Sequence, residues 1–444
     1  MDRKLTAIIV GAGHRSLYYA SYANEFPQSL EIVGVADPVP LRREQAARMF
    51  NLDPNMCFES SDDLASRPQL ADFIINGTMD HQHIPTSLPL LERGYDLLLE
   101  KPFATSTAEL WQLVEVVQRT RRKVAICHVL RYAPFYAAIR QKVLEGAIGD
   151  ILSVQAVEHV SYHHMAVGYV RGKWNRKNYS QSSMLMAKSC HDLDLIAWMK
   201  SGIQPLRVAS FGSNFQFTPD KAPPGAGTRC LVDCSIEAEC LYSARKHYLD
   251  HPDRWAFYVW DSLEHIENPT PQDRLESLKT SPYGRCVWKT DMDVVDHQAV
   301  LVEFSDGCTA TLNMIGGTAK PSRSLHLVGT HGEIEGRLEE SRFTIRRIDP
   351  RPGCEYLEEL FDFNLKGDTT GAHGGHGGGD LRLVADFLRV LNGEPPSISS
   401  TSLADSIYGH LLGFSADRSM ELGRTVSIEL LLEQSAPLLR QYLR

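Results

Sequence analysis

The sequence predicts an α/β fold made of a parallel-sheet domain at residues 1–130 and an α+β domain with a large, mostly antiparallel sheet at residues 131–444. Three observations support this prediction. Short apolar strands alternate with helical segments through the first 130 residues. After that point, short strands joined by turns replace the alternation. A glycine-rich turn also follows the first strand directly. The 444 residues are enough for two such domains.

Each element of the first domain follows from local pattern. Consecutive apolar positions without alternation indicate strands covered on both faces, and a helix after each strand indicates right-handed βαβ units. The expected strands are residues 5–10, 30–36, 71–76, 95–99 and 123–127, and the expected helices are residues 16–25, 41–50, 84–93 and 107–121.

The second domain is expected to begin with a helix and to contain antiparallel strands packed by helices on one face. Residues 215–290 have little periodicity and are expected to form an irregular, cysteine-containing insertion. The expected helices are residues 135–145 and 381–391, with two more near the end, and the expected strands are residues 151–159, 299–304, 308–314, 324–328 and 342–348.

Composition restricts the partners and the compartment. The net charge is −9 and no run of Lys or Arg forms a basic stripe, so neither nucleic acid nor an anionic membrane surface is an expected partner. No apolar run approaches the roughly 20 residues that span a bilayer. The first apolar run is a strand rather than a signal peptide, and nine cysteines, an odd number, favour reduced thiols. We therefore expect a cytoplasmic protein.

The turn GAGHRS at Gly11 to Ser16 has the strand-before, helix-after context of a dinucleotide-binding turn. Gly11 permits the tight turn, and Gly13 lets the backbone approach a pyrophosphate at the helix N-terminus. Asp37 ends the second strand, where its carboxylate would bind the ribose diol and repel a 2′-phosphate. The sequence thus predicts a Rossmann domain that binds NAD rather than NADP, although the turn alone also occurs in other α/β proteins.

Two further residues have the chemistry of a reacting centre. Lys101, in Glu100-Lys101-Pro102, follows a strand at the edge where open α/β sheets bind ligands, and an ammonium there stabilises a developing alkoxide. His191 lies near the start of a helix and can accept a hydroxyl proton. The alternatives are a surface lysine before a turn and a structural histidine.

These residues together resemble the glucose–fructose oxidoreductase / inositol dehydrogenase / MocA family (Gfo/Idh/MocA). The matching segments run in order along the chain. They are GAGHRS, Ala36 to Pro38 (ADP), Thr78 to His83 (TMDHQH), Glu100 to Ala104 (EKPFA), Arg131 to Pro134 (RYAP), Cys190 to Met199 (CHDLDLIAWM) and Gly329 to Gly336 (GTHGEIEG).

The resemblance implies that Lys101 is the catalytic lysine and that His191 assists proton transfer. It also implies a homodimer or homotetramer, because the large sheet of this family often forms the subunit interface. The residues expected to bind the cofactor, from the turn and the resemblance together, are Gly11, Gly13, His14, Arg15, Asp37, Thr78, Asp80, His83, Glu100, Lys101 and Arg131.

One departure from the family pattern concerns the segment before the histidine. The family has Asp-x-Gly-x-His, whereas this chain has Ala187 at the aspartate position. Either Lys188 changes the charge there or Asp192 compensates for it. Residues expected to bind substrate are Lys101, Tyr162, His163, Lys188, His191, Asp192 and His297, and further histidines expected near the cleft are His159, His164, His373 and His376.

Cysteines gather in the insertion. Cys230, Cys234 and Cys240 lie within eleven residues, and Cys286 or His247 could supply a fourth ligand. Thiolates this close could hold a structural zinc ion, and the alternative is a set of reduced thiols.

The leading functional hypothesis is NAD-dependent hydride transfer from a secondary alcohol of a sugar, sugar derivative or cyclitol. The alternative is an NAD-dependent glycoside hydrolase that combines transient oxidation, elimination, water addition and re-reduction with no net redox change. That enzyme needs a further acid/base group, for which Tyr162, His163 and His164 are candidates. A redox-silent nucleotide sensor is a third class, which Lys101 and His191 argue against.

Overall fold

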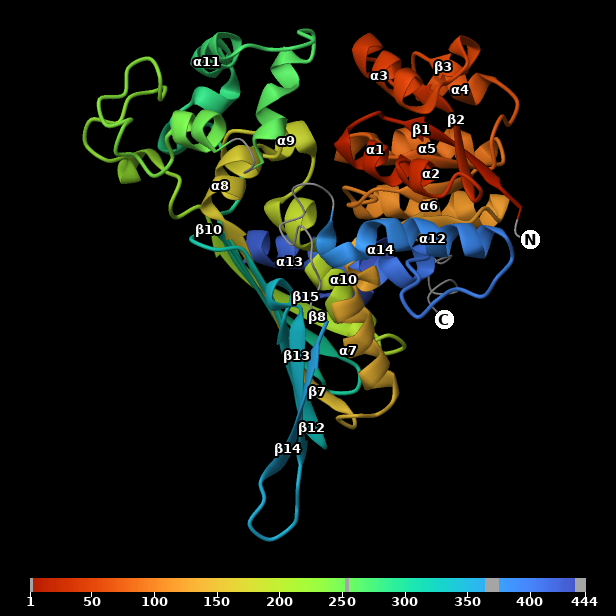
Figure 1. The fold of residues 1–444 in the computed structure, drawn as a ribbon. Coiled ribbons are helices and arrows are strands. Elements are labelled where there is room, and N and C mark those ends of the chain that lie inside the picture. Colours follow the sequence, from red (N-terminus) through yellow and green to blue (C-terminus); the bar gives the residue numbers. More distant parts are fainter. Residues whose placement is uncertain (1–2, 252–254, 364–374, 436–444) are drawn as a thin grey trace.

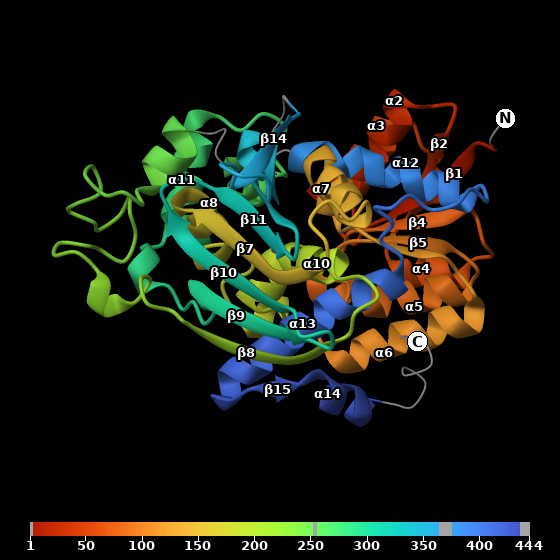
Figure 2. The ribbon, with the colours of Figure 1, turned by 90° about the horizontal axis from the view of Figure 1, so that it is seen from below.

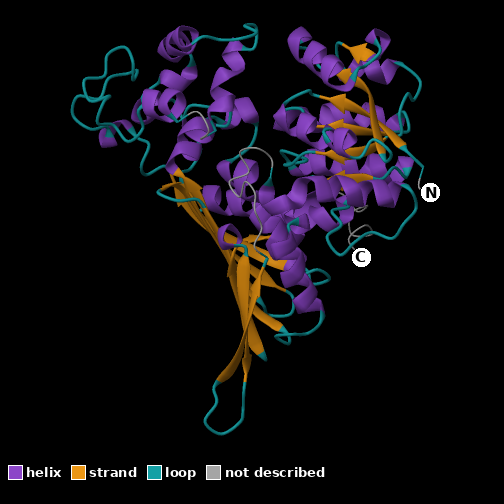
Figure 3. Ribbon diagram, in the orientation of Figure 1, coloured by secondary structure: helices purple, strands orange, loops and turns teal. Residues whose placement is uncertain are grey.

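The computed structural model describes residues 3–251, 255–363 and 375–435. Two sheets form the framework, and both appear as separate groups of orange strands in Figure 3. The first belongs to the N-terminal domain, and the second extends away from it (Figure 1). The predicted combination of a Rossmann domain with a mostly antiparallel domain is confirmed.

The first sheet is six-stranded and entirely parallel, in the order β3-β2-β1-β4-β5-β6. Its central strands are apolar at consecutive positions and buried on both faces, as a doubly covered parallel sheet requires. The strands are β1 (Leu5–Val10), β2 (Leu30–Ala36), β3 (Cys57–Phe58), β4 (Phe73–Asn76), β5 (Asp96–Leu99) and β6 (Val124–Ile126).

Helices cover both faces of this sheet. They are α1 (His14–Ala20), α2 (Tyr22–Glu25), α3 (Pro40–Phe50), α4 (Ser61–Ser66), α5 (His83–Glu92) and α6 (Thr107–Thr120). A late helix, α12 (Gly379–Leu391), joins them: its apolar side chains Leu383, Val384 and Phe387 share a buried core with strands of the first sheet. Figure 1 shows α12 beside the N-terminal domain. The chain therefore returns to the first sheet after strands β7 to β14 of the second one, and adds the edge strand β15 afterwards.

The second sheet has nine strands in the order β14-β13-β12-β11-β7-β10-β9-β8-β15. All neighbouring pairs are antiparallel except β7 and β10, which are parallel. The strands are β7 (Ile151–Ser161), β8 (Pro205–Ser213), β9 (His297–Phe304), β10 (Thr309–Thr318), β11 (Ser322–Gly329), β12 (Gly332–Arg337), β13 (Arg342–Ile348), β14 (Tyr356–Asp362) and β15 (Val426–Ser427).

Helices pack on the inner face of this sheet, between it and the N-terminal domain (Figure 2). The most buried is α10, all ten residues of which are buried. This burial fixes the residues at its start, including His191. Apart from α11 and α12, the α-helices that follow the first domain are α7 (Pro134–Leu144), α8 (Tyr162–Met165), α9 (Lys177–Ser180), α10 (Cys190–Met199), α13 (Leu403–Leu422) and α14 (Ile428–Ser435), and α8 and α9 lie at the end of the sheet beside the insertion (Figure 1).

The insertion at residues 215–290 is irregular, as expected, but it has a small aromatic core of its own. Its main elements are α11 (Pro271–Thr280) and a 3₁₀ segment at Ala256–Leu263. Tyr248 and Trp255 pack together in that core. The insertion stands on the side of the molecule that faces α1 and α3 (Figure 1).

The expected structural zinc is not supported. Cys230, Cys234, Cys240 and Cys286 are free thiols, and within the described residues no three His, Cys, Asp or Glu side chains gather to hold a metal ion. The reason is chemical: zinc needs thiolates, whereas burial raises the pKa of Cys240 and Cys286. Cys230 instead accepts a hydrogen bond from Arg171 at 3.4 Å.

Among the described residues, every helix is too short or too polar to cross a membrane.

Candidate active site

A cavity of about 330 Å³ lies between the N-terminal domain, the start of α10 and the insertion. It runs from the glycine-rich turn to Lys101 and His191, so that one space joins the predicted nucleotide site to the predicted reacting centre. Of the predicted site residues, those that line it are Gly13, His14, Arg15, Thr78, Asp80, His83, Glu100, Lys101, Lys188 and His191.

The glycine-rich turn has the geometry that a pyrophosphate needs. Gly11 has φ +77°, and a Cβ there would lie 2.9 Å from Thr78, so only glycine fits. At Gly13 a Cβ would meet no atom within 4 Å, which leaves open space in front of α1. No side chain caps the start of α1 and its first turn contains no acid, so its amides face that space.

Asp37 lies at the end of β2, as predicted, and is buried. Its two carboxylate oxygens accept hydrogen bonds from the amides of Ala12 at 2.7 Å and Val39 at 2.8 Å. The side chain thereby ties the end of β2 to the glycine-rich turn. It lies beside the cavity rather than on its lining.

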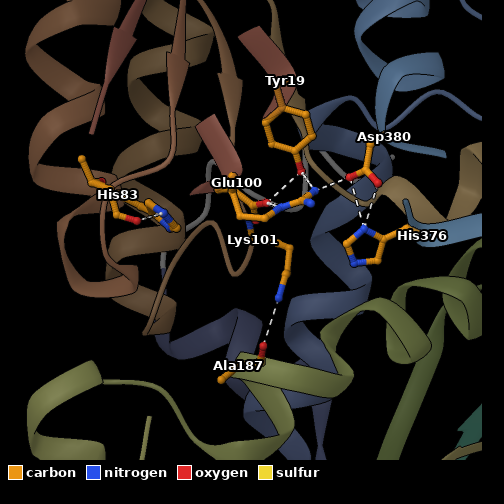
Figure 4. Close-up of polar contacts among 9 residues, drawn as sticks. Tyr19, His83, Glu100, Lys101, Ala187, His376 and Asp380 are labelled. Atoms are coloured by element: carbon orange, nitrogen blue, oxygen red, sulfur yellow. Dashed lines mark hydrogen bonds and ion pairs between the residues drawn. The ribbon is translucent and has the colours of Figure 1, made fainter. Parts of the chain in front are cut away.

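Glu100 organises the residues next to Lys101. It accepts hydrogen bonds from Arg15 at 3.0 Å and Tyr19 at 2.7 Å, and from the Lys101 amide at 2.6 Å. Burial alone would raise the pKa of Glu100, but Arg15 and Lys101 outweigh it and hold that pKa below its usual value. Figure 4 shows Tyr19 directed at this carboxylate and Lys101 extending the other way.

Asp380, on α12, completes this network from a distant part of the chain. Its carboxylate pairs with Arg15, and His376 Nδ1 lies 2.9 Å from the same group. Figure 4 shows His376 and Asp380 together beside Glu100. The return of α12 to the first sheet therefore adds an acid and a histidine to the site.

Lys101 Nζ donates to the carbonyl oxygen of Ala187 at 3.0 Å. A backbone carbonyl thus contacts the ammonium at the residue where the family pattern has an aspartate. Among the described residues, no carboxylate forms an ion pair with Lys101, which lines the cavity.

His191 is buried at the start of α10. Burial, and then the positive charge of Lys101 and the proximity of His128, lower its pKa well below the usual value for histidine. Its Nδ1 is buried without a hydrogen-bond partner in the structure. The imidazole is therefore neutral at pH 7, which is the form that accepts a proton.

His83 holds the two loops on either side of the cavity mouth. Its ring nitrogens lie 2.7 Å from the Pro102 carbonyl oxygen and 3.0 Å from the Thr78 carbonyl oxygen. The contact fixes the loop after β4 against the segment that contains Lys101.

A buried charge cluster lies behind Lys188. Its Nζ pairs with Glu158 at 3.1 Å, and Arg323 Nε lies 2.5 Å from Glu158 and 3.1 Å from Asp192. Burial and the neighbouring Glu158 raise the pKa of Asp192 to about 7 against the opposing effect of Arg323. Lys188 and Arg323 line the cavity, while the two carboxylates do not.

Comparison with known proteins gives a family match for the N-terminal domain. Residues 5–128 match the family model for Gfo/Idh/MocA, described as an oxidoreductase family with an NAD-binding Rossmann fold. The resemblance to the Gfo/Idh/MocA oxidoreductases is confirmed. The matched residues contain the glycine-rich turn, Asp37 and Lys101, so the model covers the nucleotide half of the cavity.

Relatives extend beyond that segment. "Putative oxidoreductase YteT" of Bacillus subtilis is 25% identical over 382 residues, which are 84% of this chain and 85% of that protein. An inositol 2-dehydrogenase of Corynebacterium glutamicum is 24% identical over 238 residues, 53% of this chain and 65% of that enzyme. A glycosyl hydrolase family 109 protein of a Shewanella strain is 24% identical over 127 residues, 27% of this chain and 28% of that protein.

The fold agrees over nearly the whole length. The structure of levoglucosan dehydrogenase in complex with NADH superimposes with a TM-score of 0.68 at 16% identity, and the match covers 96% of this chain and 99% of that one. This similarity shows that the overall fold, including the nine-stranded sheet, is shared with that structure.

Several predicted site residues lie outside the cavity. Arg131 is fully buried and pairs with Asp194 through Nε at 2.7 Å and Nη2 at 2.6 Å. His297 contacts the neighbouring Asp296 at 2.8 Å on β9. The others outside the lining are Gly11, Asp37, Tyr162, His163, His159 and Asp192, and His373 lies outside the described residues.

The sequence reasoning missed the aromatic cover that the insertion places over the nucleotide turn. Phe257 stacks on His14 with ring centroids 4.7 Å apart, and Trp255 stacks on His164 at 3.7 Å. Glu264 pairs with Arg42 at 2.9 Å across the same gap. The aromatic run WAFYVW at residues 255–260 could have predicted such a cover.

Proposed function

We propose that this chain transfers hydride between a secondary alcohol of a sugar, sugar derivative or cyclitol and NAD. The observation that carries the proposal is the continuous cavity in which the open space before Gly13 leads to Lys101 and His191. When bound along the turn, the dinucleotide supplies the two-electron acceptor for this chemistry.

Side chains of the protein accept the proton that the substrate hydroxyl loses. The neutral imidazole of His191 accepts the hydroxyl proton as the carbon is oxidised. The Lys101 ammonium, which is held in place by its bond to the Ala187 carbonyl, stabilises the developing negative charge on the alcohol oxygen. His191 is buried and Lys101 is partly buried, so the Lys101 charge acts on the substrate more strongly than it would in bulk solvent.

NAD is proposed over NADP because the Asp37 carboxylate ends β2 beside the turn and would repel a 2′-phosphate. The same carboxylate is held in place by two backbone amides. A cytoplasmic location and assembly into a homodimer or homotetramer stay predictions.

Redox-neutral glycoside hydrolysis is the second candidate, because a glycosyl hydrolase family 109 protein is among the relatives. It requires an additional acid/base group near the reacting carbon. His164 and His376 both line the cavity and are available for that role, whereas Tyr162 and His163 are not on its lining.

One assay tests both candidates. The purified protein is incubated with NAD and either free sugars and polyols or nitrophenyl glycosides, while NADH absorbance and nitrophenol release are followed together. Stoichiometric NADH with a free sugar or polyol is the expected result. Nitrophenol release that needs only catalytic NAD and yields no NADH would establish the hydrolase instead.

A further inference from the structure

The wall of the cavity beside His191 carries three cationic side chains: Lys101, Lys188 and Arg323. They come from three separate parts of the chain, namely the segment after β5, the residues before α10, and β11. Lys188 and Arg323 are almost completely buried, with 11% and 7% of their side chains exposed. Burial of cations at this density needs compensating negative charge.

Two carboxylates that do not line the cavity supply this negative charge. Glu158 on β7 and Asp192 on α10 bind the two cations, but neither carboxylate lines the cavity. Arg323 uses Nε for both contacts, and its two Nη groups have no hydrogen-bond partner among the described residues. The Lys188 ammonium has three N–H donors, and its ion-pair partner is Glu158. Because Lys188 and Arg323 line the cavity and the two carboxylates do not, the donors that these carboxylates leave unused are available to a ligand in the cavity.

No acid on the cavity lining opposes this wall. The acidic side chains that do line the cavity have partners of their own: Glu100 binds Arg15, Glu264 binds Arg42, and Asp80 accepts from Trp174 Nε1 at 3.2 Å. Asp261 lies within 4.0 Å of Arg42. The part of the cavity next to His191 is thus lined by hydrogen-bond donors and positive charge.

We propose that the substrate is a sugar acid, whose carboxylate is bound by Arg323 Nη and Lys188 Nζ while its secondary alcohol lies at Lys101 and His191. This inference rests on the proposed function and narrows its substrate class. A planar carboxylate matches the two Nη groups of a guanidinium in a bidentate pair, and such charge-assisted bonds are stronger than those to a neutral hydroxyl. Glu158 and Asp192 fix the guanidinium in advance, so little side-chain ordering remains for binding.

Proton balance at Asp192 supports the same assignment. Its pKa lies at about 7, under the opposing effects of burial, Arg323, Glu158 and Lys188. A substrate carboxylate at Arg323 adds negative charge nearby and favours the protonated form of Asp192. The cluster can therefore accept an anion by taking up a proton rather than by separating an ion pair.

The test compares sugars that differ only in the carboxylate. Binding of glucuronate and glucose, and of galacturonate and galactose, to the NADH-loaded protein is measured by calorimetry, and oxidation of each pair is measured with NAD. We expect at least one acid to bind at least tenfold more tightly than its neutral counterpart. Arg323→Lys and Lys188→Gln should each lower that acid-to-neutral ratio about tenfold, because each removes a charge-assisted bond. Lys142→Gln, at an exposed ion pair on α7, is the matched control and should not change the ratio.

Each outcome is decisive. Neutral sugars bound as well as acids, or ratios unaltered in both variants, overturn the sugar-acid inference, even if NADH still forms. Acids that bind with the expected variant effects but are never oxidised keep the inference about the site and overturn the proposed dehydrogenase. NADH binding and thermal unfolding are recorded for every variant, so that a folding defect is distinguished from a loss of anion binding. Arg323→Lys keeps the buried positive charge and is therefore expected to fold.

Discussion

The Lys101 ammonium is held 3.0 Å from the carbonyl oxygen of Ala187, a residue whose side chain has no charge. The family pattern that this chain resembles has an aspartate at that position, whereas here a backbone carbonyl is the acceptor. This difference leaves the wall beside His191 with more positive charge than the family pattern provides.

Restoring the acid should therefore weaken binding of an acidic substrate. Ala187→Asp adds a carboxylate to the cavity lining, and we expect it to lower affinity for the preferred sugar acid about tenfold relative to Ala187→Asn, its uncharged control of similar size. Calorimetric titration of both variants measures the effect. Equal affinities in the two variants would count against an electrostatic role for this wall.

Loss of either proposed catalytic residue should lower kcat. His191→Asn removes the proton acceptor and Lys101→Met removes the positive charge, and each should reduce kcat about 10²- to 10⁴-fold. Steady-state NADH formation measures this. His331→Asn and Lys142→Met alter the same residue types away from the cavity and should behave as the unaltered protein does; activity retained in His191→Asn would assign the proton to another group.

The two glycines of the turn should respond differently to the same change. Gly13→Ala points a methyl group into open space, so we expect unaltered thermal stability but weakened NAD binding. Gly11→Ala forces alanine to φ +77° and into contact with Thr78, so it should destabilise the fold itself. Thermal unfolding and NAD titration separate the two effects, and full NAD affinity in Gly13→Ala would argue against a pyrophosphate at this turn.

The aromatic cover should strengthen nucleotide binding. Phe257→Ala removes the ring that stacks on His14, and we expect NAD affinity to fall several-fold. Phe215→Ala changes an exposed ring at the start of the insertion and is the control. Fluorescence titration with NADH measures both, and identical affinities would mean that the contact has no part in holding the cofactor.

Acid should destabilise the protein through its buried histidines. Burial lowers the pKa of His128, His164, His191 and His410 well below 6.5, so each is neutral when folded. Below pH 6.5 the unfolded chain binds protons that the folded chain does not. Stability is therefore fully present above that pH and falls as pH decreases, by up to about 1.4 kcal/mol per pH unit for each histidine.

Denaturant unfolding at pH 7.5 and pH 5.5, at constant ionic strength, tests this. His410→Asn removes one of the four groups and should make the pH dependence shallower. A free energy of unfolding that is the same at both pH values would mean that these histidines take up protons in the folded protein at pH 5.5, as they do in the unfolded chain.

Local sequence pattern was sufficient to predict most strands of the first sheet. β1 and β2 have the predicted bounds, because an apolar run of consecutive positions followed by a glycine or an aspartate defines both ends of a buried parallel strand. β3 was not predicted, since two residues carry no period. β14 also escaped prediction: it is largely exposed, so it lacks the alternation that marks a half-buried strand.

The site residues that could be predicted are likewise those that lie in local sequence motifs. Gly13, Lys101 and His191 lie in motifs that the sequence displays directly. Arg323 gave no signal because it is one basic residue in an ordinary strand, and its importance comes from Glu158 and Asp192, which are distant in sequence. Contacts between remote segments depend on how the sheets pack, and a short stretch of sequence carries no information about that packing.

The return of α12 to the first sheet means that the smallest transplantable nucleotide-binding module of this protein is discontinuous. A fragment ending near residue 130 would leave uncovered the apolar surface that Leu383, Val384 and Phe387 fill, and Arg15 would lose Asp380. Chimaeras with other proteins of this fold would therefore need at least two junctions, one after β6 and one before Gly379. Strands β7 to β14 lie between these junctions, whereas β15 stays with the C-terminal segment.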